Sequence, residues 1–145
     1  MAMNANPGTQ VLLAGNPNSG KTSIFNALTG ARQRVGNYPG VTVEKRQGEL
    51  RVNGDRYWVT DLPGTYSLTS FSPEESIAQA ELLNANGSVV VAVVDSNTLS
   101  RSLVLLTQIM QTGANPVLCL NMADEARKAG QRLDLDRLED RKSVV

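Results

Sequence analysis

Short apolar runs recur along the chain and predict strands that are buried on both faces. They cover residues 10–14, 88–94 and 116–120, and the first of them stops at Gly15. A strand exposed on one side would alternate apolar and polar positions, whereas these runs are nearly unbroken. The pattern therefore predicts a sheet with helices on both sides.

Apolar positions between these runs recur at helical spacing. One helix is expected over residues 21–28 and another over 99–110, and Gly30 and Gly113 end them because glycine commonly ends helices. Pro73 predicts a further helix start, since proline followed by acidic residues suits a first helical turn. The apolar positions expected to face the core are Ile24, Phe25, Leu28, Leu99, Leu103, Leu106 and Met110.

Two more strands differ from the buried runs. Residues 42–52 and 56–61 flank Asn53 and Gly54, and an Asn-Gly pair is a strong hairpin signal because both residues accept positive φ. The hairpin predicts one antiparallel edge pair on an otherwise parallel sheet.

The remaining segments carry weaker patterns. Residues 31–40 and 62–73 are expected to be irregular loops, and the first to be mobile, because glycine and proline interrupt any periodicity. Residues 133–141 predict a charged surface helix, and a further strand is expected to start within 142–145.

The composition fits one globular domain. Of the 145 residues, 41% are hydrophobic and 19% are charged, which excludes a disordered chain. The 14 Lys and Arg residues balance 14 Asp and Glu residues, so a broad basic face for nucleic acid is not expected. Histidine is absent, which excludes histidine-based catalysis. No apolar run approaches the roughly 20 residues that span a bilayer, and Cys119 is expected to be a buried small hydrophobe.

The segment between the first strand and the first helix fits the phosphate-loop pattern G-x-x-x-x-G-K-[ST]. Glycines let the backbone wrap a phosphate with several N–H groups pointing inward, and the helix N-terminus adds a positive dipole end. Lys21 is expected to reach the β- and γ-phosphates, and the Thr22 hydroxyl to bind Mg²⁺. A chance glycine-rich turn is the alternative. The expected nucleotide-binding residues are Gly15, Asn16, Pro17, Asn18, Ser19, Gly20, Lys21, Thr22 and Ser23.

A second motif, Asp61-Leu62-Pro63-Gly64, ends the third strand of the predicted sheet. An aspartate at that place can hold Mg²⁺ through water, and the Gly64 N–H can contact the γ-phosphate. The motif is weak alone and strong at this distance after a phosphate loop.

A third motif, Asn121-Met122-Ala123-Asp124, follows the last buried strand and is similar to the Asn-Lys-x-Asp signature of GTPases, with Met122 in the lysine place. The Asp124 carboxylate can accept hydrogen bonds from N1–H and the 2-amino group of guanine, and adenine offers neither donor. Met122 can lie along the base. A helix cap and a solvated acid are the alternative reading of Asn121 and Asp124.

Thr42 is the candidate for the mobile-loop threonine of a nucleotide switch. With GTP bound, its hydroxyl would complete the coordination of Mg²⁺ and its N–H would contact the γ-phosphate, with Gly40 and Val41 beside it. A β-branched residue that starts a strand is the alternative.

Four stretches of the sequence closely resemble the N-terminal GTPase domain of the ferrous iron transport protein B family. They are residues 15–22, 35–44, 61–68 and 72–75, within a resemblance that covers about Val11 to Asp124. The resemblance implies an α/β P-loop GTPase fold that binds GTP or GDP with Mg²⁺. It also implies K⁺ stimulation, with Asn18 helping to hold K⁺ where other GTPases place an arginine finger.

The resemblance further implies a place for this domain in a longer protein. A helical domain and a transmembrane domain that moves Fe²⁺ would follow it, at the cytoplasmic face of the bacterial inner membrane, and the GTPase would act as a slow switch. Residues 1–145 are then expected to be one soluble GTP-binding domain that lacks its last strand and helix. An exposed sheet edge of this kind invites self-association.

Two departures from GTPase patterns stand out. Thr65 follows Gly64 where Ras-like enzymes carry a water-orienting glutamine, and the family's last guanine-contacting Ser-Ala pair is missing. Two rival functions therefore stay open. The first alternative to the transporter switch is an RNA- or ribosome-associated GTPase. The second is a nucleotide-binding module with little turnover.

Overall fold

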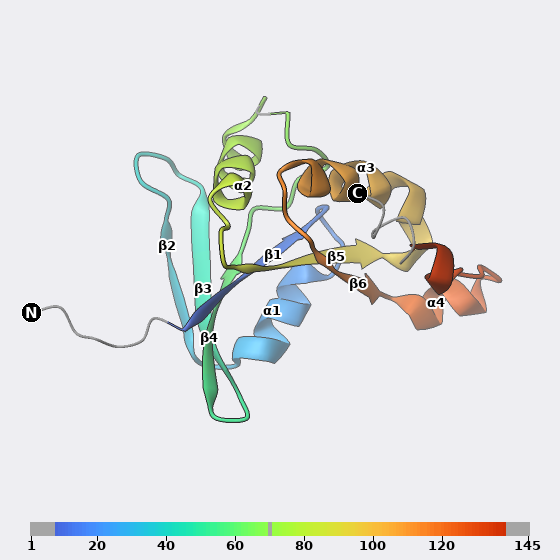
Figure 1. Cartoon of the computed structure of the whole chain (residues 1–145), viewed down its shortest axis with the longest axis horizontal. Helices are drawn as coiled ribbons and strands as arrows, with labels where there is room; N and C mark the ends of the chain where they lie inside the picture. The colour runs from blue at the N-terminus through green and yellow to red at the C-terminus, as the bar shows by residue number, and fades with distance from the viewer. Residues whose placement is uncertain (1–7, 70, 139–145) are drawn as a thin grey trace, which may run out of the picture.

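The computed structural model describes residues 8–69 and 71–138. Within this part of the chain, six strands form one sheet in the order β2-β3-β4-β1-β5-β6 (Figure 1). The strands are β1 (Thr9–Gly15), β2 (Gln33–Asn37), β3 (Glu44–Val52), β4 (Asp55–Asp61), β5 (Val89–Asp95) and β6 (Val117–Asn121). The pairs β4–β1, β1–β5 and β5–β6 are parallel, and β2–β3 and β3–β4 are antiparallel. The predicted fold class is thereby confirmed.

Helices cover both faces of the sheet (Figure 1). The helices are α1 (Lys21–Thr29), α2 (Pro73–Leu83), α3 (Leu99–Gln111) and α4 (Ala123–Lys128), with a 3₁₀ turn η1 (Ser96–Thr98) before α3. Residues 135–138 form a further helical turn, within the helix predicted over 133–141. The rest of that predicted helix and the strand start predicted within 142–145 lie outside the described residues. Among the described residues, no helix is both long and apolar enough to cross a membrane.

Alternate side chains of β1 point to opposite faces of the sheet and belong to two separate core clusters. Val11 and Leu13 pack with Phe25 of α1 on one face, whereas Leu12 and Ala14 join side chains from α2 and α3 on the other. Leu13 and Phe25 are fully buried, and burying each such side chain stabilises the fold by about 1.5–3 kcal/mol. The prediction that β1 is covered on both sides is confirmed.

The hairpin prediction is confirmed, because Asn53 and Gly54 have φ values of 52° and 87° between β3 and β4. The reading of residues 31–40 as an irregular loop was wrong, because Gln33–Asn37 form β2. This strand pairs with β3 from Glu44 to Gly48, and its side chains are mostly exposed. Backbone hydrogen bonds along an exposed sheet edge form it, so no apolar pattern signals it.

Two helix faces also differ from prediction. The buried side chains of α3 are Ser102, Leu105, Leu106 and Ile109, whereas Leu103 is 37% exposed. The run of apolar residues in this helix fits two neighbouring helical faces, and packing on the sheet selects one of them. Leu28, predicted to face the core, is 38% exposed at the end of α1.

The N-terminus of α2 begins at the predicted proline. Ser72 caps the helix, because its hydroxyl accepts a hydrogen bond from the Glu75 N–H at 3.1 Å. The Glu75 carboxylate in turn accepts from the Phe71 N–H at 3.1 Å. These two bonds satisfy backbone donors at the helix start, as in a capping box.

Strand β6 is less buried than predicted, because it forms the outer strand of the described sheet. Val117 is 51% exposed and Cys119 is half-buried. Burial raises the pKa of the Cys119 thiol, which lowers its reactivity as a nucleophile.

At Gly48, β3 packs closely against α1. A Cβ at this position would lie 2.5 Å from Cγ2 of Thr29. We expect Gly48→Ala to lower the free energy of unfolding by about 1–3 kcal/mol through overpacking, measured by urea denaturation. Gly36→Ala is the matched control, because no atom lies within 4 Å of its added Cβ. Equal losses in the two variants would contradict this packing.

Candidate functional site

Three loops with the predicted motifs meet at one edge of the sheet. They follow the carboxyl ends of β1, β4 and β6, and β1 and β4 are parallel neighbours with Leu13 opposite Asp61. Ligands of open α/β sheets bind outside the carboxyl ends of the strands. The fold therefore brings the phosphate loop and the Asp61–Gly64 segment together.

The phosphate loop leaves β1 at Gly15 and enters α1 at Lys21. Asn18 and Gly20 adopt positive φ values of 65° and 83°, a backbone shape that turns successive N–H groups toward one concave side. The loop borders a cleft of about 370 Å³. The residues that line this cleft are Asn16, Pro17, Asn18, Gly20, Lys21, Thr22, Ser23 and Gly64.

The second loop packs directly on the phosphate loop. The Thr65 N–H donates to the Gly15 carbonyl at 3.2 Å, and a Cβ at Gly64 would lie 3.2 Å from Cα of Pro17. Gly64 thus lines the cleft. Thr65 is buried, and its backbone hydrogen bond to Gly15 joins the two loops.

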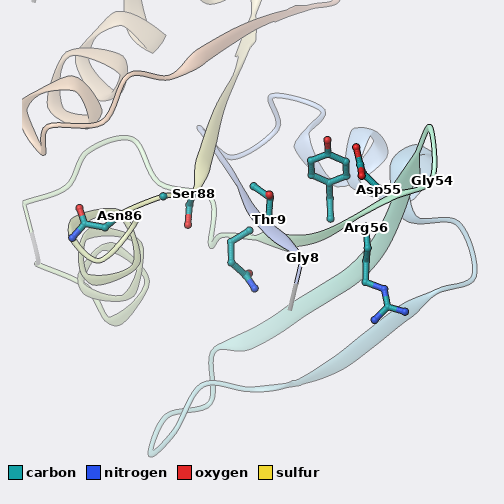
Figure 2. Close-up of a pocket in the computed structure, with 10 residues that line it drawn as sticks. Gly8, Thr9, Gly54, Asp55, Arg56, Asn86 and Ser88 are labelled. Atoms are coloured by element: carbon teal, nitrogen blue, oxygen red, sulfur yellow. The ribbon is translucent and has the colours of Figure 1, made fainter. Parts of the chain in front are cut away.

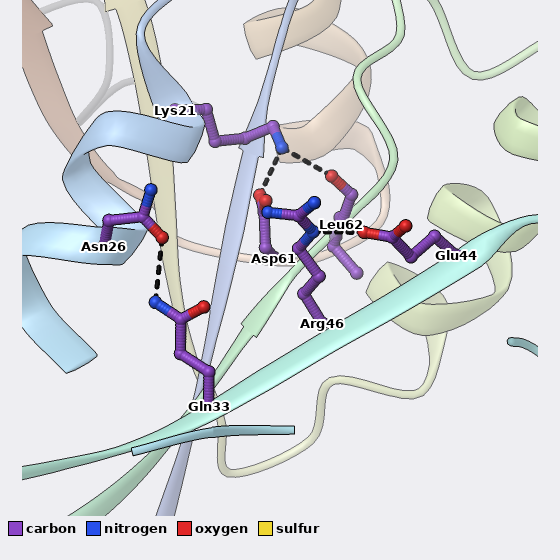
Figure 3. A network of polar contacts seen from close by, with 7 residues as sticks. All are labelled: Lys21, Asn26, Gln33, Glu44, Arg46, Asp61 and Leu62. Carbon is purple, nitrogen blue, oxygen red and sulfur yellow. Dashed lines mark hydrogen bonds and ion pairs between the residues drawn. The ribbon is translucent and has the colours of Figure 1, made fainter. Parts of the chain in front are cut away.

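Lys21 and Asp61 form a buried ion pair in this structure (Figure 3). The Lys21 ammonium also donates to the Leu62 carbonyl at 2.6 Å. Lys21 was predicted to bind phosphate and Asp61 to bind Mg²⁺. The residues fit a Mg²⁺–nucleotide, because each charge of the pair would meet an opposite charge on the ligand.

The Thr22 hydroxyl belongs to an exposed residue in the first turn of α1. Among the described residues, no group of three or more His, Cys, Asp or Glu gathers into a metal site. Mg²⁺ in nucleotide sites is bound by one or two protein groups together with phosphate oxygens. Thr22 and Asp61 are sufficient for that arrangement.

Asn121 joins the third motif to the phosphate loop. Its side-chain amide donates to the Ser19 carbonyl at 3.0 Å, and a Cβ at Gly20 would lie 2.1 Å from Nδ2 of Asn121. A larger residue at position 20 would be strained at a φ of 83° and would displace the Asn121 amide. Met122 lies close by, since its Cε would be 3.3 Å from the same Cβ.

Asp124 lies in the first turn of α4 and is exposed. Its carboxylate forms no hydrogen bond or ion pair within the part of the chain that the structure describes, and Met122 before it adopts a φ of 57°. The turn through Met122 directs the chain from β6 into α4. Asn121 does not cap α4, because the N-cap position is Met122 and no side chain caps this helix.

The predicted switch threonine is not at the cleft. Thr42 is exposed, as are Gly40 and Val41, and none of the three lines the cleft. The Arg34 guanidinium carbon, from β2, lies 5.7 Å from the centre of the Trp58 ring. It is held on the sheet and does not reach the phosphate loop.

Sequence patterns missed one polar contact within the site. The Asn16 amide donates to the Ser102 hydroxyl of α3 at 3.4 Å, across 86 positions of sequence. Both residues are buried. Only the fold reveals the contact, since neither residue belongs to a shared motif.

A larger hollow, of about 900 Å³, lies at the opposite end of the sheet (Figure 2). It contains none of the predicted nucleotide-binding residues, and it lies at the amino ends of β1 and β5, where α/β sheets seldom bind ligands. Its size therefore does not make it the candidate site. Its lining residues are Gly8, Thr9, Gln10, Gly54, Asp55, Arg56, Tyr57, Asn86, Gly87 and Ser88.

Comparisons with known proteins agree with this geometry. The Fe(2+) transporter FeoB of Salmonella typhimurium is 46% identical over 133 residues, which cover 89% of this chain and 17% of the relative. The cytosolic domain of the T. maritima FeoB iron transporter in its GMPPNP form is 44% identical with a TM-score of 0.88, covering 93% of this chain and 54% of that one. A variant of S. thermophilus NFeoB bound to GDP is 45% identical with a TM-score of 0.84, covering 90% of this chain and 51% of that one.

The chain thus spans only 17% of the length of the curated transporter. The profile of the family described as "Ferrous iron transport protein B" matches residues 9–144, nearly the whole chain. On this match and on the shared fold, the chain belongs to the ferrous iron transport protein B family.

Proposed function

We propose that this chain is the guanine-nucleotide-binding and GTP-hydrolysing switch domain of a ferrous iron transporter. The observation that carries the proposal is the bond from Asn121 to Ser19. It fixes the loop after β6 against the phosphate loop, so that Asp124 and the cleft can contact the two ends of one nucleotide. Relatives with solved structures bound to GDP and in a GMPPNP form support the proposal.

In the proposed complex, each loop has one task. Lys21 leaves Asp61 and donates to the β- and γ-phosphates, and the loop N–H groups complete the phosphate cradle. Asp124 accepts from N1–H and the 2-amino group of guanine while Met122 lies along the base. Thr22 and Asp61 hold Mg²⁺, which neutralises phosphate charge when bound. Gly64 and Thr42 contact the γ-phosphate, Thr42 after its loop moves.

A slow, K⁺-stimulated rate is part of the proposal. Thr65 stands in the place of a water-orienting glutamine and is buried. Asn18 lies in the cleft lining beside Lys21, so its amide oxygen can help to hold K⁺. The cation would take the place of the arginine finger of other GTPases, which is worth about 10³–10⁵ in rate. In the whole transporter, the switch would act on the domains that move Fe²⁺.

Asp124 is expected to select guanine. The unchanged chain should bind GDP roughly 10⁴-fold more tightly than ADP, because adenine would leave a desolvated carboxylate unpaired. Asp124→Ala should reduce that preference to about tenfold or less. Calorimetry with both nucleotides and Mg²⁺ measures it, with Glu125→Ala as the matched control on the neighbouring exposed carboxylate. A chain that binds ADP as well as GDP, or a variant that keeps the preference, would refute the proposed function.

Asn18 is expected to make GTP hydrolysis depend on K⁺. The rate in KCl should exceed the rate in NaCl by about tenfold or more, measured as phosphate release at equal ionic strength. Asn18→Gly should lose this difference, since glycine accepts the φ of 65° without strain but offers no amide oxygen. Equal rates of the unchanged protein in the two salts, or a variant that still responds to K⁺, would rule out this role.

A further inference from the structure

Tyr38 directly follows β2 and begins the loop of residues 38–43, hereafter the Tyr38 loop. The loop is closed by two backbone bonds. The Tyr38 N–H donates to the Val43 carbonyl at 2.9 Å, and the Tyr38 carbonyl accepts from the Val41 N–H at 3.3 Å. Gly40, with a φ of 75°, makes the turn possible. Tyr38 therefore begins the loop and also takes part in both backbone hydrogen bonds that close it.

Unlike its neighbours in the loop, the Tyr38 side chain is buried. It is 6% exposed, whereas Val41 is 38% exposed. The ammonium of Lys45, from β3, lies 5.2 Å from the centre of the Tyr38 ring, a distance at which a cation is attracted to the ring face. Tyr38 is therefore the residue of this loop whose side chain is buried in the protein.

The environment of the Tyr38 hydroxyl is unfavourable. Burial raises its pKa above the ordinary value, and the negative charges of Glu81 in α2 and Asp61 in β4 raise it further. The hydroxyl oxygen is also buried without a hydrogen-bond partner among the described residues. Ring packing and the Lys45 cation thus hold a side chain whose polar end is poorly accommodated, since an unpaired buried hydroxyl is costly.

The attachment affects Thr42, which is exposed and outside the cleft lining while the ring is buried. We propose that Tyr38 is a positioning residue that anchors its loop away from the nucleotide cleft, and that GTP must withdraw the ring before Thr42 can reach the γ-phosphate. This inference rests on the proposed function and names the residue that regulates it. GDP, which has no γ-phosphate, leaves the anchor in place.

In this proposal, GTP and GDP differ in affinity because only GTP binding requires the Tyr38 ring to leave its buried position. A ligand shifts a conformational equilibrium only by its difference in affinity for the two states. Any change that makes the buried ring more stable lowers the affinity for a GTP analogue and spares that for GDP, and loss of the ring does the reverse.

Two variants separate the parts of the anchor. Tyr38→Phe keeps the ring and removes the unpaired hydroxyl, so the ratio of GMPPNP to GDP affinity should fall about fivefold. Tyr38→Ala removes the ring, so the ratio should rise by a similar factor of about five. Calorimetry with Mg²⁺ measures both ratios. Val35→Ala is the control, because Val35 belongs to β2 and is 61% exposed.

Hydrogen exchange gives a second readout that needs no turnover. The amides of residues 38 and 41 should be protected without nucleotide and with GDP, and should exchange faster with GMPPNP. Without nucleotide, Tyr38→Ala should lose this protection and Tyr38→Phe should keep it.

Unchanged affinity ratios in both ring variants, or equal exchange in all nucleotide states, would overturn the anchor while leaving nucleotide binding intact. If neither nucleotide binds the unchanged chain, the proposed function itself fails, and the anchor loses its role in it.

Discussion

The buried contact between Lys21 and Asp61 joins the two loops on which the site depends. Lys21 begins α1, Asp61 ends β4, and β1 runs between them as the parallel neighbour of β4. Two opposite charges with little exposure to water stabilise each other only while they stay together, and removal of one partner of such a pair costs about 3–5 kcal/mol. A ligand that separates them must therefore offer a replacement charge to each. Phosphate oxygens and a divalent cation would do so together, as in the proposed metal–nucleotide complex.

Backbone packing fixes the loops as firmly as the charges do. Gly20 lies against the Asn121 amide and Gly64 against Pro17, so a side chain at either position would force its neighbour in the adjoining loop to shift. The glycines that a phosphate needs for close approach are thus the same glycines that let three loops pack together. The bond from Asn121 to Ser19 also joins the loop after β6 to the phosphate loop.

The parts of the molecule that sequence predicts best are those in which one local pattern has one structural meaning. The strand before Gly15, the Asn53–Gly54 hairpin and the start of α2 at Pro73 follow from such patterns. Side chains of the strand before Gly15 belong to both core clusters. Strand β2 could not be found in this way, because it is mostly exposed, carries no run or alternation of apolar residues, and becomes a strand only by pairing with β3.

The site shows the same division. Motifs indicate which residues gather at the sheet edge, but they do not reveal the contacts that these residues make with one another without a ligand. That Lys21 and Asp61 neutralise each other, and that Thr42 lies outside the cleft, depend on contacts between segments far apart in sequence. The Tyr38 side chain gives no signal of its own in the sequence, since an aromatic residue in a glycine-rich loop is expected to be exposed.

The most direct test of the central ion pair is a crystal structure of this chain with GDP and Mg²⁺. We expect the Lys21 ammonium within hydrogen-bond distance of a β-phosphate oxygen, the Asp61 carboxylate turned toward the metal, and the Asp124 carboxylate at the guanine edge. A nucleotide bound elsewhere, with Lys21 still paired to Asp61, would contradict the assignment of this cleft.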